Sequence, residues 1–479
     1  MKQSGILSAL LLSSVLTISE AGLATSIELP SLGDASSGII SQKQEFELGR
    51  TWLKILRSQT PTIDDAQIKD YLERLVSRLS ASSDLSDHRL APLVIDSPVL
   101  NAFAAPGGII GVNAGLFLHS ETEAQFAAVI AHELAHLSQR HYARNVEDAR
   151  NKSIPTAAAL LGSIIIMATA GADAGAAALT STVAGIQSSK LRFSRQFERE
   201  ADNLGIQTLA RAGFDPQSMP EIFEAMNKAS RYGGRPPEFL LTHPVTENRI
   251  ADSRARADQM STQTLRTQKG SFDYQLIRMR TAIAANQNPH ELIRQFKKEL
   301  DSGFTPSKEL TGYGLALAYK KTRQYKNASG QMSKLLNNKP DNLYYIMTQA
   351  LLEAETGSDK KGIGRIDQAL KNNPDNYPLL ATKAKIFITT QDYAKARTLF
   401  LQLSRMRPED PDIWYELAEV QGQSDDILGL HQSRAEFFFL TGNIDDAIKH
   451  LQYARKLAGD NFALKSKLDQ KLADMYSYR

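Results

Sequence analysis

Small and apolar residues in the second half of the chain recur with a period of 34 residues. The interval is kept by one set of prolines and one set of alanines: Pro306, Pro340, Pro374 and Pro408, and Ala282, Ala316, Ala350 and Ala384. This is the tetratricopeptide period, in which each unit is a pair of helices that buries its apolar face only by stacking on its neighbours. The pattern therefore predicts an α-solenoid whose concave face binds partners.

The same register sets the limits of the repeats. Small residues mark the close approach of the two helices within a unit, at Ala328, Gly362 and Ala396, and a further unit follows after a shift of half a period, with Ala435, Ala447 and Gly459. The unit from Tyr274 to Ser307 is degenerate, because Arg294 replaces the small residue. We expect repeats at residues 309–479, preceded by a linker and the degenerate repeat at residues 261–308.

Two segments of the first half show other patterns. Apolar residues lie at helical spacing at Phe126, Val129, Ile130, Leu134 and Leu137, and no Gly or Pro occurs before Asn151. This pattern predicts one helix, with Ser120 and Glu123 spaced as a capping box at its start. Residues 103–113 alternate weakly and hold Ile109, Ile110 and Val112, which favours a strand.

The first residues resemble a secretory signal peptide. Lys2 precedes an apolar run at residues 6–16 that is too short to span a bilayer, and small residues follow it. We expect residues 1–24 to be removed by cleavage after Ala24, with Ala21 as the alternative site.

A second apolar run, from Ile154 to Ala178, is interrupted by Gly162, Gly171 and Asp173. Because it is rich in Ala and Gly, we expect a buried or membrane-facing helix in a soluble protein, with a true membrane span as the alternative.

Composition narrows the function classes. The 479 residues are 42% hydrophobic and 23% charged, which is typical of folded protein in two or three domains. A net charge of +3 gives no indication of a nucleic-acid partner. The chain has no cysteine, so disulfides, thiolate metal sites and a cysteine nucleophile are all excluded.

The predicted helix contains an H-E-x-x-H motif formed by His132, Glu133 and His136. At about 100° per residue, the two histidines lie one turn apart on one face, where both can bind a single zinc ion, and the glutamate lies beside them. The alternative is that the two are capped or core histidines of an ordinary helix.

A hydrolytic zinc needs a third protein ligand. Gln139 and Tyr142 occupy the positions where an extended form of the motif would have Gly and His, His141 points away from the metal-facing side, and Glu147 lies about 16 Å along the helix axis. The ligand must therefore come from another segment.

The best source is the helix-like stretch that begins with residues 191–205. This helix is expected to end at Gly213. Glu198 and Asp202 share one face of this stretch, whereas Glu200 lies about 200° away from Glu198.

Together these motifs resemble the gluzincin peptidases related to HtpX and the CAAX prenyl proteases. The family signature is H-E-x-x-H followed by E-x-x-x-D, here Glu198 to Asp202, and two further stretches fit it: residues 101–108, and Thr242-His243-Pro244 with Asn248-Arg249-Ile250. The resemblance covers about residues 40 to 260. It implies a metalloprotease domain, placed at residues 25–260, in an α+β, mostly helical protein that continues into the repeats.

The resemblance also implies roles. His132, His136 and Glu198 would hold one Zn²⁺ per chain, Glu133 would be the general base, and Asp202 would orient a ligand imidazole or assist proton transfer, two roles that spacing does not separate. The segment Asn101, Ala102, Phe103 and Ala104 would belong to an edge strand that pairs with an extended substrate. In the periplasmic members, the residue at His243 lies in a plug over the zinc; a plain loop histidine is the alternative.

We therefore expect a secreted, periplasmic zinc endopeptidase that degrades misassembled outer-membrane proteins and assists their assembly. Its repeats would recruit unfolded or misassembled substrate or the outer-membrane assembly machinery, with peripheral membrane contact allowed and no nucleic acid involved. The alternative is a chaperone or binding module whose zinc site is structural or permanently plugged. Glu133 argues against this alternative, because a purely structural site needs no base.

Overall fold

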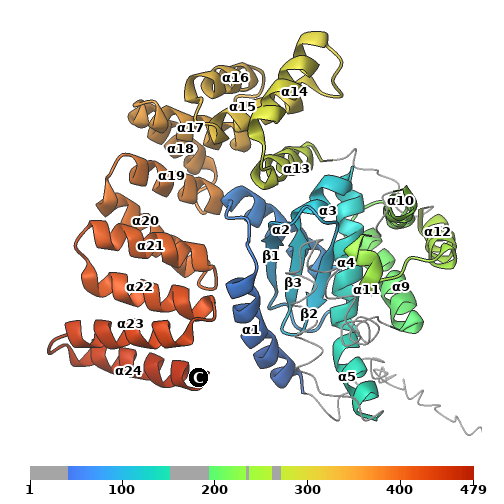
Figure 1. Cartoon of the computed structure of the whole chain (residues 1–479), viewed down its shortest axis with the longest axis horizontal. Helices are drawn as coiled ribbons and strands as arrows, with labels where there is room; N and C mark the ends of the chain where they lie inside the picture. Colours follow the sequence, from blue (N-terminus) through green and yellow to red (C-terminus); the bar gives the residue numbers. More distant parts are fainter. Residues whose placement is uncertain (1–40, 152–193, 233–236, 262–270, 479) are drawn as a thin grey trace, which may run out of the picture.

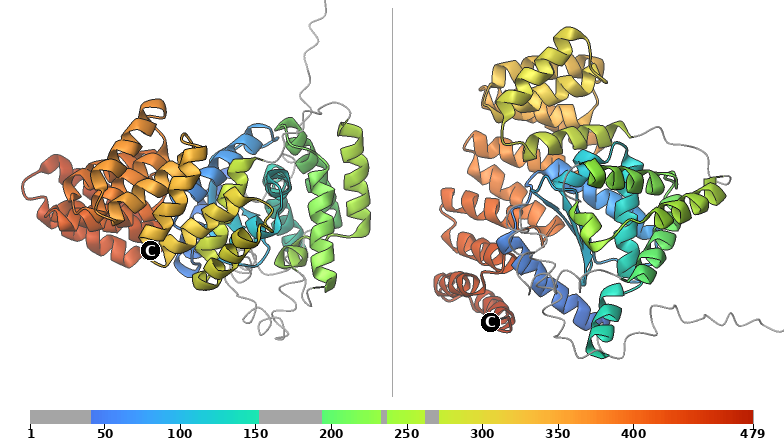
Figure 2. Two further views of the ribbon diagram at one scale, coloured as in Figure 1. Left: turned by 90° about the horizontal axis from the view of Figure 1, so that it is seen from above. Right: turned by 45° about the vertical axis from the view of Figure 1, so that its right-hand side comes forward.

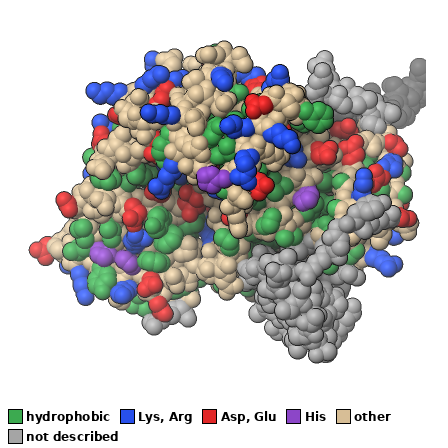
Figure 3. Space-filling model, turned by 45° about the horizontal axis from the view of Figure 1, so that its top comes forward, with side chains coloured by type: hydrophobic (Ala, Val, Ile, Leu, Met, Phe, Trp, Pro, Cys, Tyr) green, Lys and Arg blue, Asp and Glu red, His purple; other side chains and the backbone are tan. Residues whose placement is uncertain are grey.

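A computed structural model describes residues 41–151, 194–232, 237–261 and 271–478. The expected signal peptide and the apolar run from residue 154 to residue 178 lie outside these ranges. Among the helices within them, none has the length and apolar character needed to cross a membrane. Acidic and basic side chains are interspersed over the face shown in Figure 3, in line with the near-balanced net charge.

A three-stranded sheet lies at the centre of the first half, with strand order β1-β3-β2. β1 (Ala91–Ile95) runs parallel to β3 (Ile109–Asn113), and β2 (Ala102–Ala105) is the antiparallel edge strand. The single strand expected over residues 103–113 was wrong. It is a hairpin, because Gly107 and Gly108 adopt φ of 78° and 75° and reverse the chain.

Helices flank this sheet (Figure 1). α1 (Gln42–Gln59) and α2 (Ala66–Ala81) precede it, α3 (Ala114–His119) follows β3, and α4 (Glu123–Ser138) contacts β2. α9 (Arg195–Arg211) packs along α4, and α10 (Ser218–Tyr232), α11 (Glu238–Thr242) and α12 (Glu247–Ser261) complete this half. The approach of α9 to α4 depends on Gly205, since a Cβ there would lie 3.1 Å from the backbone of His132.

The capping box of α4 is formed by Thr122 and Gln125, two residues beyond the predicted pair. Ser120 instead ends α3 as its C-cap residue. Glu123 accepts a hydrogen bond of 2.6 Å from the Tyr71 hydroxyl of α2. The predicted pair was wrong because a short helix, α3, ends directly before α4 and takes the serine.

The helix expected to run to Asn151 is interrupted. α4 ends at Ser138, Arg140 takes a left-handed φ of 49°, and α5 (His141–Asn151) begins a new direction. A left-handed backbone costs a non-glycine residue about 1–2 kcal/mol. The buried Arg140 guanidinium bonds the Glu45 carboxylate at 2.8 Å, a contact that offsets this cost.

The predicted solenoid is confirmed, as a run of antiparallel helix pairs. Its helices are α13 (Phe272–Ala285), α14 (Pro289–Ser302), α15 (Lys308–Lys321), α16 (Tyr325–Asn338), α17 (Leu343–Glu355), α18 (Asp359–Asn372), α19 (Tyr377–Thr389), α20 (Tyr393–Met406), α21 (Pro411–Gln423), α22 (Ile427–Leu440), α23 (Ile444–Leu457) and α24 (Phe462–Tyr476). The repeated small residues lie at the helix contacts: a Cβ on Gly362 would lie 2.6 Å from the Ala350 carbonyl oxygen.

The solenoid curves around α1 and α2 (Figure 1 and Figure 2). Lys69 of α2 contacts both Asp410 and Asp412, and the Arg407 guanidinium lies 2.9 Å from Asp70. At the far end, the Lys54 ammonium lies 3.9 Å from the centre of the Phe439 ring. A cavity of about 920 Å³ remains between α2, β1 and the loop that joins α20 to α21.

The degenerate repeat joins the two halves. The Tyr274 hydroxyl of α13 donates a 2.8 Å hydrogen bond to the Ser120 carbonyl oxygen, and Arg280 bonds Asp65 at 2.7 Å. One hydrophobic core runs without a break from Ile63 through α13 to Ile386 of α19. The two halves are thus packed as one body.

Candidate metal centre

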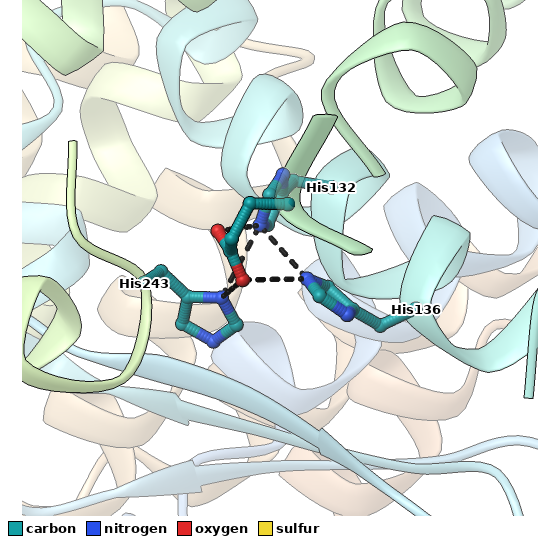
Figure 4. A group of neighbouring side chains, drawn as sticks. His132, His136 and His243 are labelled. Carbon is teal, nitrogen blue, oxygen red and sulfur yellow. Dashed lines mark hydrogen bonds and ion pairs between the residues drawn. The ribbon is translucent and has the colours of Figure 1, made fainter. Parts of the chain in front are cut away.

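Three histidines and one glutamate converge in the interior of the first half (Figure 4). His132 and His136 come from α4, Glu198 from α9, and His243 from the end of α11. Their candidate ligand atoms all lie within 4.8 Å of one another, and all four residues are buried. Among the described residues, this is the only such group.

The spacing of the four ligand atoms fits a tetrahedral metal. His132 Nε2 lies 3.0 Å from His136 Nε2 and 3.3 Å from His243 Nδ1. Glu198 Oε1 lies 3.0 Å from His243 Nδ1 and 3.5 Å from His136 Nε2. Ligands about 2.0 Å from a tetrahedral zinc are separated by about 3.3 Å, so the donor set suits this ion without rearrangement.

Asp202 and Arg249 support the cluster from behind. The Asp202 carboxylate lies 3.0 Å from His132 Nδ1 and accepts two bonds of 2.7 Å from Arg249. The same guanidinium lies 2.7 Å from Glu198 Oε2 and donates to the Pro244 carbonyl oxygen at 2.8 Å. Burial alone would raise the pKa of both carboxyls, but the histidines and Arg249 hold both pKa values below their ordinary range.

Glu133 lies beside the cluster but outside its four ligand atoms. Its carboxylate is 1% exposed, lies 3.7 Å from His243 Nε2 and accepts a hydrogen bond from the Ala104 backbone of β2. Burial raises the pKa of Glu133, against the opposing effect of His243 and His132. A glutamate with a raised pKa is a stronger base than an exposed one.

The segment expected to pair with substrate lies in and directly before the edge strand β2. Asn101 directly precedes β2, and Ala102, Phe103 and Ala104 belong to it, at the edge of the sheet that faces α4. A pocket opens beside the end of this strand, lined among others by Ala104, Pro106, His136, Leu137 and Tyr142.

Three residues near the centre were missed as site residues by sequence reasoning. Arg249 was part of a motif without an assigned role, and His141 and Glu200 were set aside because their direction excluded them as ligands. The structure places His141 and Glu200 directly behind His136. A signal for Arg249 was present, since a buried pair of acids needs a cation.

Comparison with known proteins agrees with this geometry. The profile of peptidase family M48 matches residues 66–257. The putative beta-barrel assembly-enhancing protease of Vibrio cholerae is 35% identical, over 90% of this chain and 88% of its own length. The beta-barrel assembly-enhancing protease of Escherichia coli is 31% identical, over 89% and 86%. The mitochondrial metalloendopeptidase OMA1 of Schizosaccharomyces pombe is 34% identical over 38% of this chain and 50% of its own. The chain therefore belongs to the family of beta-barrel assembly-enhancing proteases and is a metalloprotease with a peptidase family M48 domain.

Proposed function

We propose that this protein is a periplasmic zinc endopeptidase that degrades misassembled outer-membrane proteins and assists their assembly. The observation that carries the hydrolytic part is the position of Glu133, buried next to a tetrahedral donor set without belonging to it. The assembly role is carried over from the relatives that are named beta-barrel assembly-enhancing proteases and that match nearly the whole chain.

In this proposal His132, His136 and Glu198 are the principal ligands and His243 is a fourth, displaceable one. Zinc, when bound, supplies a Lewis acid that polarises the scissile carbonyl and makes water more acidic. Glu133 takes the proton of the attacking water and passes it to the leaving amine. The Asp202 carboxylate lies 3.0 Å from His132 Nδ1 and favours a proton there, which leaves the lone pair on Nε2, the atom that faces the other ligands.

The edge strand β2 holds the substrate. Its outer edge would offer backbone groups other than the Ala104 N–H, which bonds Glu133, to an extended chain that binds as an added strand. Because such pairing uses backbone groups, it selects for unfolded or extended segments more than for a particular sequence. A misassembled outer-membrane protein presents segments of this kind.

The alternative function, a chaperone or binding module with a permanently plugged site, has one observation in its favour. His243 Nδ1 lies among the other three ligand atoms, in the place where a catalytic zinc keeps an open position. The activity of His243→Ala distinguishes a permanent plug from a displaceable one.

Metal content tests the ligand set. The purified protein should hold about one zinc per chain, and Glu198→Ala should lose it to a chelator that leaves the parent loaded, because this variant removes the only carboxylate of the donor set. Glu147→Ala is the matched control, since this carboxylate lies on α5 and takes no part in the cluster. Full zinc retention in Glu198→Ala would remove this residue from the ligand set and direct attention to Asp202 or Glu200.

Recruitment by the solenoid can be tested without truncating the chain. Phe304, between α14 and α15, and Phe462, the first residue of α24, are 88% and 83% exposed. The double variant Phe304→Asp and Phe462→Asp should reduce co-purification of partners from cells, because large exposed aromatic residues are frequent anchors of interfaces. Cleavage of a flexible peptide by this variant should stay unchanged. Recovery of the same partners at parental levels would contradict a recruiting role for these two positions.

A further inference from the structure

His136 has a polar neighbour on the side that faces away from the metal cluster. Its Nδ1 lies 2.8 Å from Nδ1 of His141, a fully buried residue. The other nitrogen of His141, Nε2, lies 3.1 Å from Glu200 Oε2. Two imidazoles and one carboxylate thus form a line of hydrogen-bonding groups that ends at a candidate metal ligand.

The break in the zinc helix produces this line. In an uninterrupted helix His141 would point away from the metal-facing side, but the left-handed backbone of Arg140 turns the chain before α5 begins. His141 then stacks on Phe197 of α9, with ring centres 4.4 Å apart and planes inclined by 9°. This stacking, together with the contacts at both ring nitrogens, holds the imidazole in a single orientation.

Glu200 fixes the direction of the hydrogen bonds. Its Oε2 accepts from Arg144 Nη1 at 2.7 Å, and its Oε1 accepts from Gln196 Nε2 at 2.9 Å. An ionised carboxylate is only an acceptor, so His141 Nε2 must carry the proton. In a neutral imidazole the other nitrogen is then an acceptor, and His136 Nδ1 must be the donor to it.

This assignment leaves the lone pair of His136 on Nε2, the atom that faces the other three ligands. We propose that His141 and Glu200 are positioning residues, which select the metal-binding tautomer of His136 and hold its ring in place. The proposal rests on the metal site of the proposed function. It gives the two motif histidines matching supports, because His132 contacts the Asp202 carboxylate directly and His136 reaches Glu200 through one intervening imidazole.

Two substitutions of His141 separate hydrogen bonding from packing. His141→Phe keeps a ring that can stack on Phe197 but has no acceptor for His136. His141→Asn places its amide oxygen where Nδ1 lies, so it restores the acceptor while losing the ring. Zinc affinity is measured by competition with a chelator, together with the unfolding midpoint of the metal-free protein.

We expect His141→Phe to weaken zinc binding by about 10- to 100-fold, the usual effect of losing a supporting group behind a ligand, and His141→Asn to recover most of this loss. Arg211→Ala is the matched control. Arg211 lies on α9 with Glu200, and its substitution removes only an exposed ion pair with Asp84, so zinc affinity should be unchanged. Equal affinity in His141→Phe and the parent, or equal weakening in both His141 variants, would overturn the proposal.

A second variant covers the case in which His141→Phe fails to fold without metal. Glu200 is partly exposed, and Glu200→Gln keeps its shape but removes its charge. This variant should also weaken zinc binding. Zinc affinity equal to that of the parent would contradict the positioning role of Glu200. A parent protein that binds no zinc at all would instead contradict the metal site itself. Failure of the positioning role and failure of the metal site therefore give different results.

Discussion

Glu133→Gln is expected to reduce peptide hydrolysis by about 10²- to 10⁴-fold, the usual contribution of a positioned general base. The amide has nearly the same shape as the carboxylate but cannot take a proton from water. The substitution should leave zinc in place, because no atom of Glu133 belongs to the cluster of ligand atoms. Casein and a fluorogenic peptide are suitable substrates, with metal content measured on the same samples.

The control for this variant is Glu121→Gln, which changes an exposed carboxylate just before the same helix. Parental hydrolysis by Glu133→Gln would remove this residue from the chemistry. The parent should also show an acid limb in its pH–rate profile. Protonation of Glu133 removes the base, so activity should be lost as the pH falls through the pKa of this carboxyl, which burial raises and a bound zinc lowers.

His243→Ala should have the opposite effect and increase hydrolysis. In the parent the imidazole takes the fourth position of the centre, where water must enter for Glu133 to act. The closed state has the His243 imidazole in the fourth position, and the open state has that position free for water. Each 1.4 kcal/mol by which the contact favours the closed state lowers the population of the open state about tenfold. Removing the contact should therefore raise the rate of casein digestion, or of self-digestion, on the order of tenfold or more.

Zinc should remain in His243→Ala, since the three principal ligands are unchanged. His119→Ala, an exposed histidine on α3, is the matched control. Loss of zinc would make His243 a required ligand. Activity no higher than the parent under matched metal loading would make it a loop residue, and hydrolysis absent from both would favour the chaperone alternative.

The parts of the fold that repeat locally were predictable from the sequence. The interval between Ala316, Ala350 and Ala384 predicts the solenoid, because these alanines hold the same place in successive units and are all fully buried. The motif helix was predictable for a similar reason, since His132 and His136 are separated by one helical turn.

What could not be predicted depends on single backbone positions or on contacts between distant segments. The φ of Arg140 moved His141 from an irrelevant direction to the back of His136. The contact of Glu198 with the motif histidines spans some sixty residues, and no local periodicity encodes it. The resemblance to known gluzincins, and not helix periodicity, singled out this carboxylate from its neighbour Glu200.

The position of α2 changes how the repeats can communicate with the protease. In an isolated array the concave side would be open, but here it faces α2, whose Lys69 is paired with Asp410 and Asp412. A ligand entering that side would compete with α2 and would have to replace these partly buried ion pairs. By thermodynamic linkage, any such ligand would bind more tightly when α2 is displaced and would displace α2 when bound. Binding of a ligand to the repeats would then be coupled to the position of α2, which packs on α4, the helix of the metal-binding motif.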